Sequence, residues 1–428
     1  MKSKIGILAL GLAASFLPSS LYAEDVKFDG SVRFRYERAE QGTLGMGKDQ
    51  TGNWITQQSR FGLKAAPKDN VDVYLQIQDA RTWGGENHSF PPPSVTDTGT
   101  DASANALDLH QGYMVLKSFL TDKGSLKVGR QEIVFDDARL VGNIGWIQNA
   151  QSFDAMRMSV GGDMGSVDLV YSQVAAKDSH PVMNPYLASH TDDSFFYAAH
   201  GSLKVGKGVI NPFIYVVDKP TRQKPGTDAS GNPNLVTLLS LQTTGFFAKQ
   251  KFGPVNLTAH LANQTGKITT TKNHKANMVA VKVGTKISDF GLSVAYDQYS
   301  GDKVKNGKES NTFNALYATN HAYFGFMDKF LFTPTTGLAD TQLKLVAPMK
   351  KMGTLVLQAH NFSTAAGSYD GGKAIGSEVD LTYKLKAAGI GWQVGYSMFS
   401  SGSTTNYGST GNTALNGGWS YLQMASKF

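Results

Sequence analysis

The 428-residue sequence contains no cysteine, which excludes both a disulfide framework and lipid attachment to an N-terminal cysteine. After residue 23 it has no run of 18 apolar residues, the length that a single membrane-spanning helix needs. Long helical periodic segments with capping residues are also missing. The chain is therefore neither a disulfide-rich secreted domain nor a helical membrane protein.

Signatures of catalysis and of metal binding are also scarce. The sequence has no HExxH and no Gly-x-Ser-x-Gly motif, and residues 301–308 lack P-loop spacing and precede Glu309. Its nine histidines include no pair at ligand spacing on one predicted strand face. We therefore expect no catalytic residues, no metal and no cofactor.

The N-terminus has the pattern of a secretory signal peptide. Lys2 and Lys4 precede an apolar stretch at 5–17, and Leu21-Tyr22-Ala23 fits a cleavage site. Residues 1–23 are the expected signal peptide, and residues 24–428 the exported domain. That domain has 39 Lys and Arg against 34 Asp and Glu, a net charge of +5, without a basic block. This mild excess argues against a nucleic acid partner and is compatible with an acidic solute.

Segments of about ten residues with alternating apolar and polar side chains recur along the whole chain. The range 26–37 has the clearest alternation, with Phe28, Phe34 and Tyr36 on one face and Arg33 and Arg35 on the other. Eighteen strands are predicted, at 26–37, 55–65, 71–80, 107–117, 124–133, 153–161, 166–175, 194–204, 208–217, 237–251, 254–265, 275–287, 290–299, 338–347, 354–364, 376–386, 390–399 and 418–428.

The predicted connections alternate between short turns and long loops. The long loops include 81–106, 134–152, 176–193, 218–236, 300–337 and 400–417. A β-sandwich or propeller has no reason for this regularity, whereas an up-and-down transmembrane barrel has short periplasmic turns and long extracellular loops. We therefore predict an all-β fold, a transmembrane up-and-down antiparallel barrel of about 18 strands.

The end of the sequence supports an outer-membrane location. The last predicted strand ends in Phe428, with Leu422 and Met424 in phase, which resembles the signal that the barrel assembly machinery recognises. A TonB-dependent transporter would carry a plug domain ahead of its first strand, where this sequence has only the signal peptide. The expected partners are outer-membrane lipid, the assembly machinery and a permeating solute.

A barrel of this size leaves an aqueous lumen unless loops fold into it. The alternation places basic side chains on the lumenal face: Arg33, Arg35, Arg60, Lys64, Arg157 and Lys384. It places acidic side chains there too: Asp29, Glu37, Asp72, Glu378 and Asp380. The lumen is therefore predicted to carry charges of both signs.

The range 126–160 is the expected place of a constriction. Leu126 and Val128 share one alternation phase, but Ile133 and Phe135 follow the other. A bulge or strand end between 129 and 132 would explain the change and would re-aim Arg130. The alternation therefore leaves the direction of Arg130 open.

Two blocks of the sequence resemble the alginate-export family of outer-membrane barrels. The first comprises Gly129-Arg130-Gln131-Glu132, Asp137, Arg139, Leu140, Gly142, Trp146, Ser152-Phe153-Asp154 and Arg157. The second comprises Thr312-Phe313-Asn314-Ala315-Leu316-Tyr317, Thr319-Asn320-His321, Tyr323, Gly325 and Asp328. The resemblance implies a monomeric eighteen-stranded barrel that passes an anionic polysaccharide or a similar polyanion outward along inward-facing arginines, Arg130 among them.

Candidate site residues follow from the alternation and this resemblance. The substrate-channel candidates are Arg33, Arg35, Arg60, Arg130, Arg139 and Arg157, with Lys64 and Lys384 as additional charges. An arginine guanidinium donates two parallel hydrogen bonds to a carboxylate and so suits an acidic sugar. The loop and constriction candidates are Asp136, Asp137, His321 and Asp328. A structural alternative stays open for each, in which these groups pair with one another and brace the wall or the loops.

The sequence predicts one leading function and leaves two alternatives open. The first is a channel for export or permeation of an anionic polysaccharide or similar acidic solute. The alternative is a general or substrate-specific uptake porin for small solutes. A remoter alternative is a barrel enzyme or an adhesin that uses the loops at 81–106 and 300–337.

Overall fold

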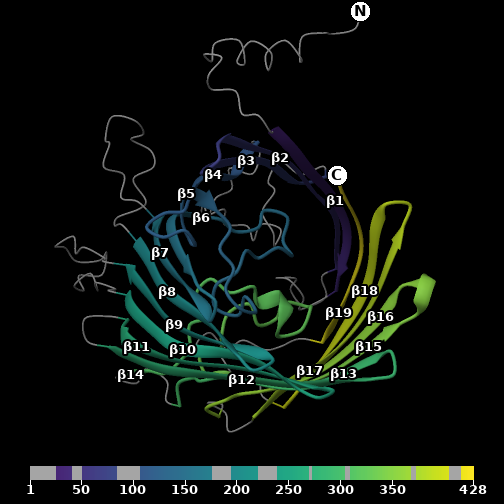
Figure 1. Ribbon diagram of the computed structural model, residues 1–428. Helices are drawn as coiled ribbons and strands as arrows, with labels where there is room; N and C mark the ends of the chain where they lie inside the picture. The colour runs from purple at the N-terminus through teal and green to yellow at the C-terminus, as the bar shows by residue number, and fades with distance from the viewer. Residues whose placement is uncertain are drawn as a thin grey trace, which may run out of the picture.

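The computed structural model describes residues 26–40, 51–83, 107–175, 194–219, 239–268, 272–303, 309–367, 373–403 and 416–428. Its strands form one closed antiparallel barrel of eighteen strands, seen along the lumen in Figure 1. Closure comes from β1 (Val26–Ala39), which pairs with β2 (Gly52–Lys68) on one side and with β19 (Gly417–Lys427) on the other. The predicted signal peptide and most of the predicted long loops lie outside the described residues.

Every one of the eighteen predicted strands is present. The remaining wall strands are β3 (Val71–Thr82), β4 (Asp108–Lys117), β5 (Gly124–Gln131), β6 (Phe153–Gly161), β7 (Gly165–Ala175), β8 (Ser194–Val205), β9 (Gly208–Lys219), β10 (Leu239–Phe252), β11 (Val255–Lys267), β12 (Asn273–Ile287), β13 (Phe290–Tyr299), β15 (Leu338–Pro348), β16 (Thr354–Ser363), β17 (Ala374–Ala387) and β18 (Ile390–Ser401). An unpredicted two-residue strand, β14 (Glu309–Ser310), runs parallel to β12. Two single-turn 3₁₀ helices, η2 (Asn320–Ala322) and η3 (Lys350–Met352), are the other elements of the described residues.

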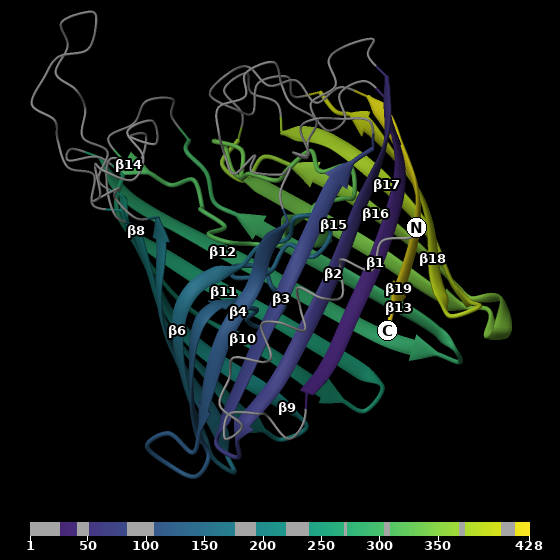
Figure 2. The same cartoon turned by 90° about the horizontal axis from the view of Figure 1, so that it is seen from above.

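The connections alternate in length as predicted. Tight turns join β2 to β3, β8 to β9, β10 to β11 and β17 to β18, and they gather at one end of the strands in Figure 2. No helix among the described residues is long and apolar enough to cross a membrane.

The outer surface of the wall is apolar on strand after strand. Phe28 is 61% exposed and Leu75 47% exposed, and similarly exposed side chains include Met114, Met156, Leu169, Ile214, Val283, Val294, Leu343, Leu381, Val394 and Leu422. A continuous apolar band of this size is stable only against lipid hydrocarbon. The outward phase therefore agrees with the predicted alternation.

The chain's last residue seals the barrel at β1. The backbone groups of Gly30 and Phe428 exchange two hydrogen bonds of 3.0 Å. The Phe428 ring lies over Gly30, where a Cβ atom would come within 2.3 Å of the ring. A side chain at position 30 would therefore displace the terminal ring from this position.

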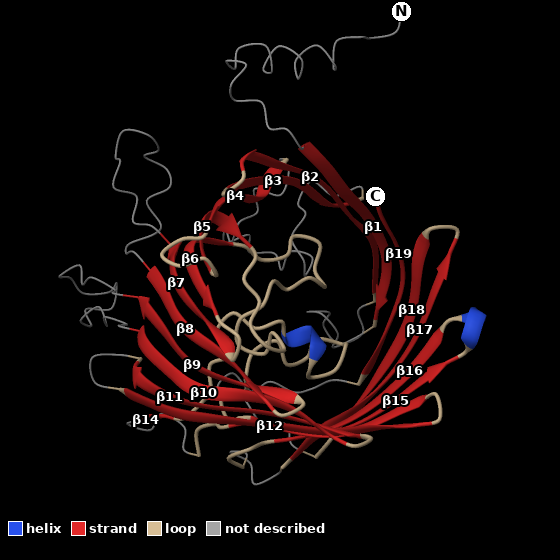
Figure 3. Ribbon diagram, viewed as in Figure 1, coloured by secondary structure: helices blue, strands red, loops and turns tan. Residues whose placement is uncertain are grey.

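Two connections turn into the lumen, and Figure 3 shows them inside the ring of strands. We call residues 132–152, between β5 and β6, the first inner loop, and residues 309–337, between β13 and β15, the second inner loop. Their buried side chains pack against wall residues in a cluster that includes Ile133, Leu140, Val141, Phe196, Tyr215, Phe313, Phe324, Met327, Phe330 and Phe362. A hydrophobic core thus occupies part of the lumen, which alternation alone predicted to be polar.

Candidate functional site

The two inner loops meet across the lumen and form a constriction. Val141 and Tyr317 are paired in a short parallel bridge. The Gly142 amide donates to the Tyr317 carbonyl, and the Tyr317 amide donates to the Leu140 carbonyl, both at 2.9 Å. The amide of Thr319 donates to the carbonyl of Ala138 at 2.9 Å. We call this contact the seam.

Arg33 and Arg35 on β1 tie the first inner loop to the wall. Arg33 donates to the carbonyls of Gly145 and Ile147, both at 2.7 Å. Arg35 donates to the Trp146 carbonyl at 2.9 Å, and its guanidinium lies 3.9 Å from the centre of the Trp146 ring. Both side chains point into the lumen as predicted, but their donors are used by the loop.

Arg60 on β2 holds the beginning of the same loop through Glu132. Its Nη1 lies 3.3 Å from Glu132 Oε1. The carboxylate also lies 2.7 Å from His110 Nε2 and accepts a hydrogen bond of 2.8 Å from Asn143. Burial alone would raise the pKa of Glu132, but the bonds from His110 and Asn143 and the charge of Arg60 lower this pKa below its ordinary value.

Asp136 and Asp137 connect the first inner loop to the opposite wall. Asp136 Oδ1 accepts a hydrogen bond of 2.6 Å from Asn211 and lies 3.1 Å from His200 Nε2. Asp137 Oδ1 lies 3.0 Å from His260 Nδ1. Although burial opposes it, the contact with His260 and the charge of Arg139 hold the pKa of Asp137 well below its usual range.

Arg139 extends this anchor to β13. Its guanidinium lies 2.9 Å from Asp297 and 3.4 Å from Asp137, and it stacks 3.8 Å from the centre of the Tyr323 ring. Burial disfavours the charged guanidinium, but Asp297 more than offsets this and keeps the pKa of Arg139 above its ordinary value. Arg139 thus joins both inner loops and the wall.

Arg157 on β6 points inward as predicted and is paired within the wall. Its Nε and Nη2 atoms each donate to Asp168 on β7 at 3.0 Å. The guanidinium lies 5.4 Å from the centre of the Phe135 ring. Arg157 therefore contacts the first inner loop from the wall, through the Phe135 ring.

Arg130 corrects the placement that the family resemblance implied. It pairs in register with Asp154, and the two side chains form an ion pair of 3.2 Å. Asp154 is 62% exposed and shares its face of β6 with outward-facing Met156. Arg130 therefore lies on the outer face and not in the lumen. β5 ends at Gln131, and beyond it Ile133 and Phe135 are buried in the core inside the lumen, so the apolar side chains change from the outer to the inner side there.

The two predicted lysines differ in their surroundings. Lys64 pairs with Asp72 at 3.5 Å, and Asp72 also pairs with Lys117 at 2.7 Å. Lys384 lies on the inner face of β17, between Thr354 and Gln393 in the register, and its side chain is exposed.

The second inner loop is braced by the remaining candidates. His321 Nδ1 lies 2.8 Å from Asp328 Oδ1, and the His321 ring stacks on Trp146 with ring centres 4.1 Å apart. Glu378 on β17 is fully buried and accepts a hydrogen bond of 2.9 Å from the Met327 amide. These contacts favour the bracing interpretation of His321 and Asp328.

The seam separates two cavities. The loop-side cavity, of about 680 Å³, reaches Val217 and Leu241, near the ends of β9 and β10 that lead into their long connection. The turn-side cavity, of about 450 Å³, reaches Lys249 and Asn256, which flank the tight turn between β10 and β11. The two cavities therefore lie on opposite sides of the constriction.

The turn-side cavity contains functional candidates that the sequence analysis missed. Lys249, Lys282 and Lys344 line it, and none has an acidic side chain within ion-pair distance among the described residues. Lys344 continues the polar phase of Asp340 and Gln342, so alternation could have found it, whereas the faces of Lys249 and Lys282 also carry buried apolar residues such as Phe247 and Met278. No feature of the local sequence, however, separates these unpaired lysines from the paired arginines.

Among the residues that the structure describes, no group of three or more histidine, aspartate or glutamate side chains is arranged to hold a metal ion. The buried carboxylates of the inner loops are instead bonded to histidine, arginine and asparagine.

The closed barrel, its apolar outer band and the loops inside its lumen define an outer-membrane channel of the porin-like class. Residues 24–363 match the alginate export family, and the chain belongs to that family. No curated protein matches the chain.

Solved structures share the fold at low identity. OccAB4 of Acinetobacter baumannii is 10% identical, with a TM-score of 0.60 over 96% of this chain and 100% of that one. OpdO of Pseudomonas aeruginosa is 11% identical, with a TM-score of 0.61 over 95% of this chain and 98% of that one. OpdK of Pseudomonas aeruginosa, solved with vanillate, is 11% identical, with a TM-score of 0.58 over 95% of this chain and 99% of that one.

Proposed function

We propose that this outer-membrane channel conducts acidic solutes in preference to cations and neutral solutes. The observation that carries the proposal is the group of lysines in the turn-side cavity, Lys249, Lys282 and Lys344, without acidic partners among the described residues. The three carboxylates that line the same cavity are held by other groups: Asp136 by His200 and Asn211, Asp137 by His260 and Arg139, and Asp297 by Arg139. The lysines are therefore the charges available to a permeating anion.

Lysine suits this task better than the arginines do. An ammonium group is a compact and strongly hydrated charge on a flexible stem, so it attracts a carboxylate without a rigid bidentate bond. Passage needs attraction that is strong enough for entry and weak enough for release. The arginines form the fixed frame, and the lysines line the path.

Small acidic solutes fit the constriction best, because the seam and its wall contacts hold two loops across the lumen. The structure of OpdK with vanillate shows a small acid with a barrel of the same fold. Membership of the alginate export family favours a second candidate, an acidic polysaccharide. A monomeric state and cleavage after Ala23 remain predictions for both.

Reversal potentials in planar bilayers under a salt gradient test the anion preference. The wild-type channel is expected to prefer chloride, and the triple variant Lys249→Gln, Lys282→Gln, Lys344→Gln to lose most of that preference. A control with the same charge change is Lys207→Gln, Lys350→Gln, Lys351→Gln, at exposed positions in the tight turns. Its effect should be small, because charges beyond about 10 Å are screened at 0.1 M salt. A cation-selective wild type, or an unchanged triple variant, would overturn the proposal.

Liposome swelling separates the two solute candidates. A monomeric uronate should enter faster than a neutral hexose of the same size, and an oligouronate should enter slowly. Equal rates for the oligouronate and the monomer would favour the polysaccharide instead.

A further inference from the structure

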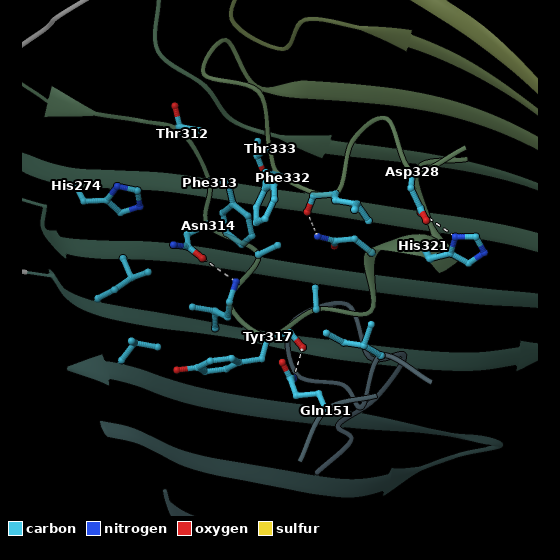
Figure 4. A pocket seen from close by; sticks show the side chains of 18 of the residues that line it. Gln151, His274, Thr312, Phe313, Asn314, Tyr317, His321, Asp328, Phe332 and Thr333 are labelled. Carbon is cyan, nitrogen blue, oxygen red and sulfur yellow. Dashed lines mark hydrogen bonds and ion pairs between the residues drawn. The ribbon is translucent and has the colours of Figure 1, made fainter. Parts of the chain in front are cut away.

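The loop-side cavity has the size and the surface of a small-molecule site. Its volume of about 680 Å³ lies within the usual range of roughly 300–1,000 Å³ for such sites. Ile144 and Ile147 of the first inner loop line it, together with Leu316, Leu331 and Phe332 of the second. Figure 4 shows Phe332 beside Phe313 in the middle of this cavity. The side chain of Phe332 is 87% exposed, although it lies inside a channel.

Several polar side chains of the cavity are already used by the loops. Gln151 donates to the Gly142 carbonyl at 2.8 Å, and Asn314 Oδ1 accepts a bond of 2.8 Å from the Leu316 amide. His321 and Asp328 bind each other, as the dashed line in Figure 4 marks. What remains available to a solute is mainly apolar surface.

Two of the apolar side chains are held in costly backbone conformations. Ile144 has a φ of +47° and Leu316 a φ of +56°, a region that bulky residues rarely adopt. The Ile144 amide donates to the Thr319 hydroxyl at 3.2 Å, so the contact between the loops maintains its conformation. Such conformations persist only where the surrounding structure enforces them, and they concentrate at functional sites.

Neighbouring residues of the first inner loop line different cavities. Ile144 and Ile147 face the loop-side cavity, whereas Asp136 and Arg139, a few residues earlier, face the turn-side cavity. A solute that crosses the seam therefore meets an apolar surface on one side and the lysines on the other. A simple inorganic anion or an uncharged sugar would use only one of these surfaces.

We propose that the loop-side cavity binds the apolar body of an amphipathic carboxylate, an acid with an aromatic ring or a branched aliphatic chain. This inference rests on the proposed preference for acidic solutes and specifies their class. The apolar body is held by Ile144, Leu316 and Phe332 before the carboxylate passes to the lysines beyond the seam.

The test compares benzoate with acetate, which carry the same charge but differ by the ring. Each is titrated from the long-loop side of single channels in planar bilayers, and the half-blocking concentration is measured. Wild-type protein is expected to bind benzoate at least about tenfold more tightly than acetate, since burial of a ring against apolar side chains contributes more than a tenfold change in affinity.

Two variants remove the apolar surface without changing charge. Phe332→Ser truncates an exposed side chain, and Ile144→Gly removes a side chain at a φ that glycine adopts without strain. Each should weaken benzoate block by about fivefold to tenfold and leave acetate block and the reversal potential unchanged. The matched control is Met164→Ser, at an 82% exposed position in the turn between β6 and β7, which should change none of these.

Equal block by benzoate and acetate in an anion-selective wild type would overturn this inference and leave the proposed function standing. A wild-type channel without anion preference would overturn the proposed function itself. If Ile144→Gly does not fold, Phe332→Ser alone decides, and wild-type benzoate affinity in that variant would refute the assignment of the cavity.

Discussion

Arg139 offers the most direct perturbation of the constriction, because it joins both inner loops to β13. We consider Arg139→Met, which keeps much of the side-chain length and removes the charge. The substitution leaves Asp297, whose side chain is 1% exposed, with a single hydrogen bond of 2.8 Å from Gln342. Asp137 keeps its contact with His260.

The free-energy cost of Arg139→Met is estimated from the buried Asp297 carboxylate, which loses its cationic partner. Removal of one partner of a buried ion pair costs about 3–5 kcal/mol, and the bond from Gln342 places this case near the lower end. A loss of about 3 kcal/mol raises the ratio of undocked to docked loop by about 150-fold. The loss falls on loop docking, since the strand pairs of the wall do not involve the Arg139 side chain.

Single-channel recording measures this effect directly. Arg139→Met should occupy a state of higher conductance far more often than the wild type, by about 150-fold relative to the docked state, and proteases should cleave the first inner loop more rapidly. The double variant Arg139→Met, Asp297→Asn removes the unpaired charge, so it should recover part of the docking that Arg139→Met loses. Wild-type conductance in Arg139→Met, or a double variant as disrupted as the sum of the two single changes, would refute the reasoning.

Three further predictions concern the same anchors. Arg33→Gln should raise conductance while it leaves anion preference largely intact, because Arg33 bonds to loop carbonyls. A reversed selectivity would show instead that Arg33 contacts ions. The control is Arg38→Gln, at an outward-facing position of the same strand. Acidification should release the first inner loop, because the pKa of Glu132 is lower in the folded protein than the value of about 4.3 in unfolded chains, so its stabilisation is complete above that pH and is lost as the pH falls through the folded pKa. Conductance recorded from pH 7 to pH 3 should show this transition in the wild type, and a transition of the same size in Glu132→Gln would contradict the assignment. Gly325→Ala should undock the second inner loop and raise conductance, because Gly325 has a φ of +82° and a Cβ atom there would lie 2.5 Å from the Glu378 carboxyl group; unchanged conductance would show that the loop tolerates the shift.

The wall of this channel could be predicted from the sequence alone. Alternation with a period of two decides which side chains of a strand face lipid and which face the lumen, so the strands and the inward direction of Arg33, Arg35, Arg60 and Arg157 could be predicted. The apolar outward faces and the regular short turns carry this information locally. This part of the prediction needs no knowledge of contacts between distant residues.

The roles of the inward side chains, in contrast, depend on contacts that form only in the folded barrel. The partners of Arg33 lie more than a hundred residues away, on a loop whose path inside the barrel leaves no periodic trace in the sequence. Arg130 lies where β5 ends, and its neighbour across the sheet, Asp154, places it on the outer face. Nothing in the local sequence marks Lys282 and Lys344 as lysines without an acidic partner. Whether such a charge is free depends on which groups the other strands and the inner loops bring beside it, and this is a property of the folded barrel.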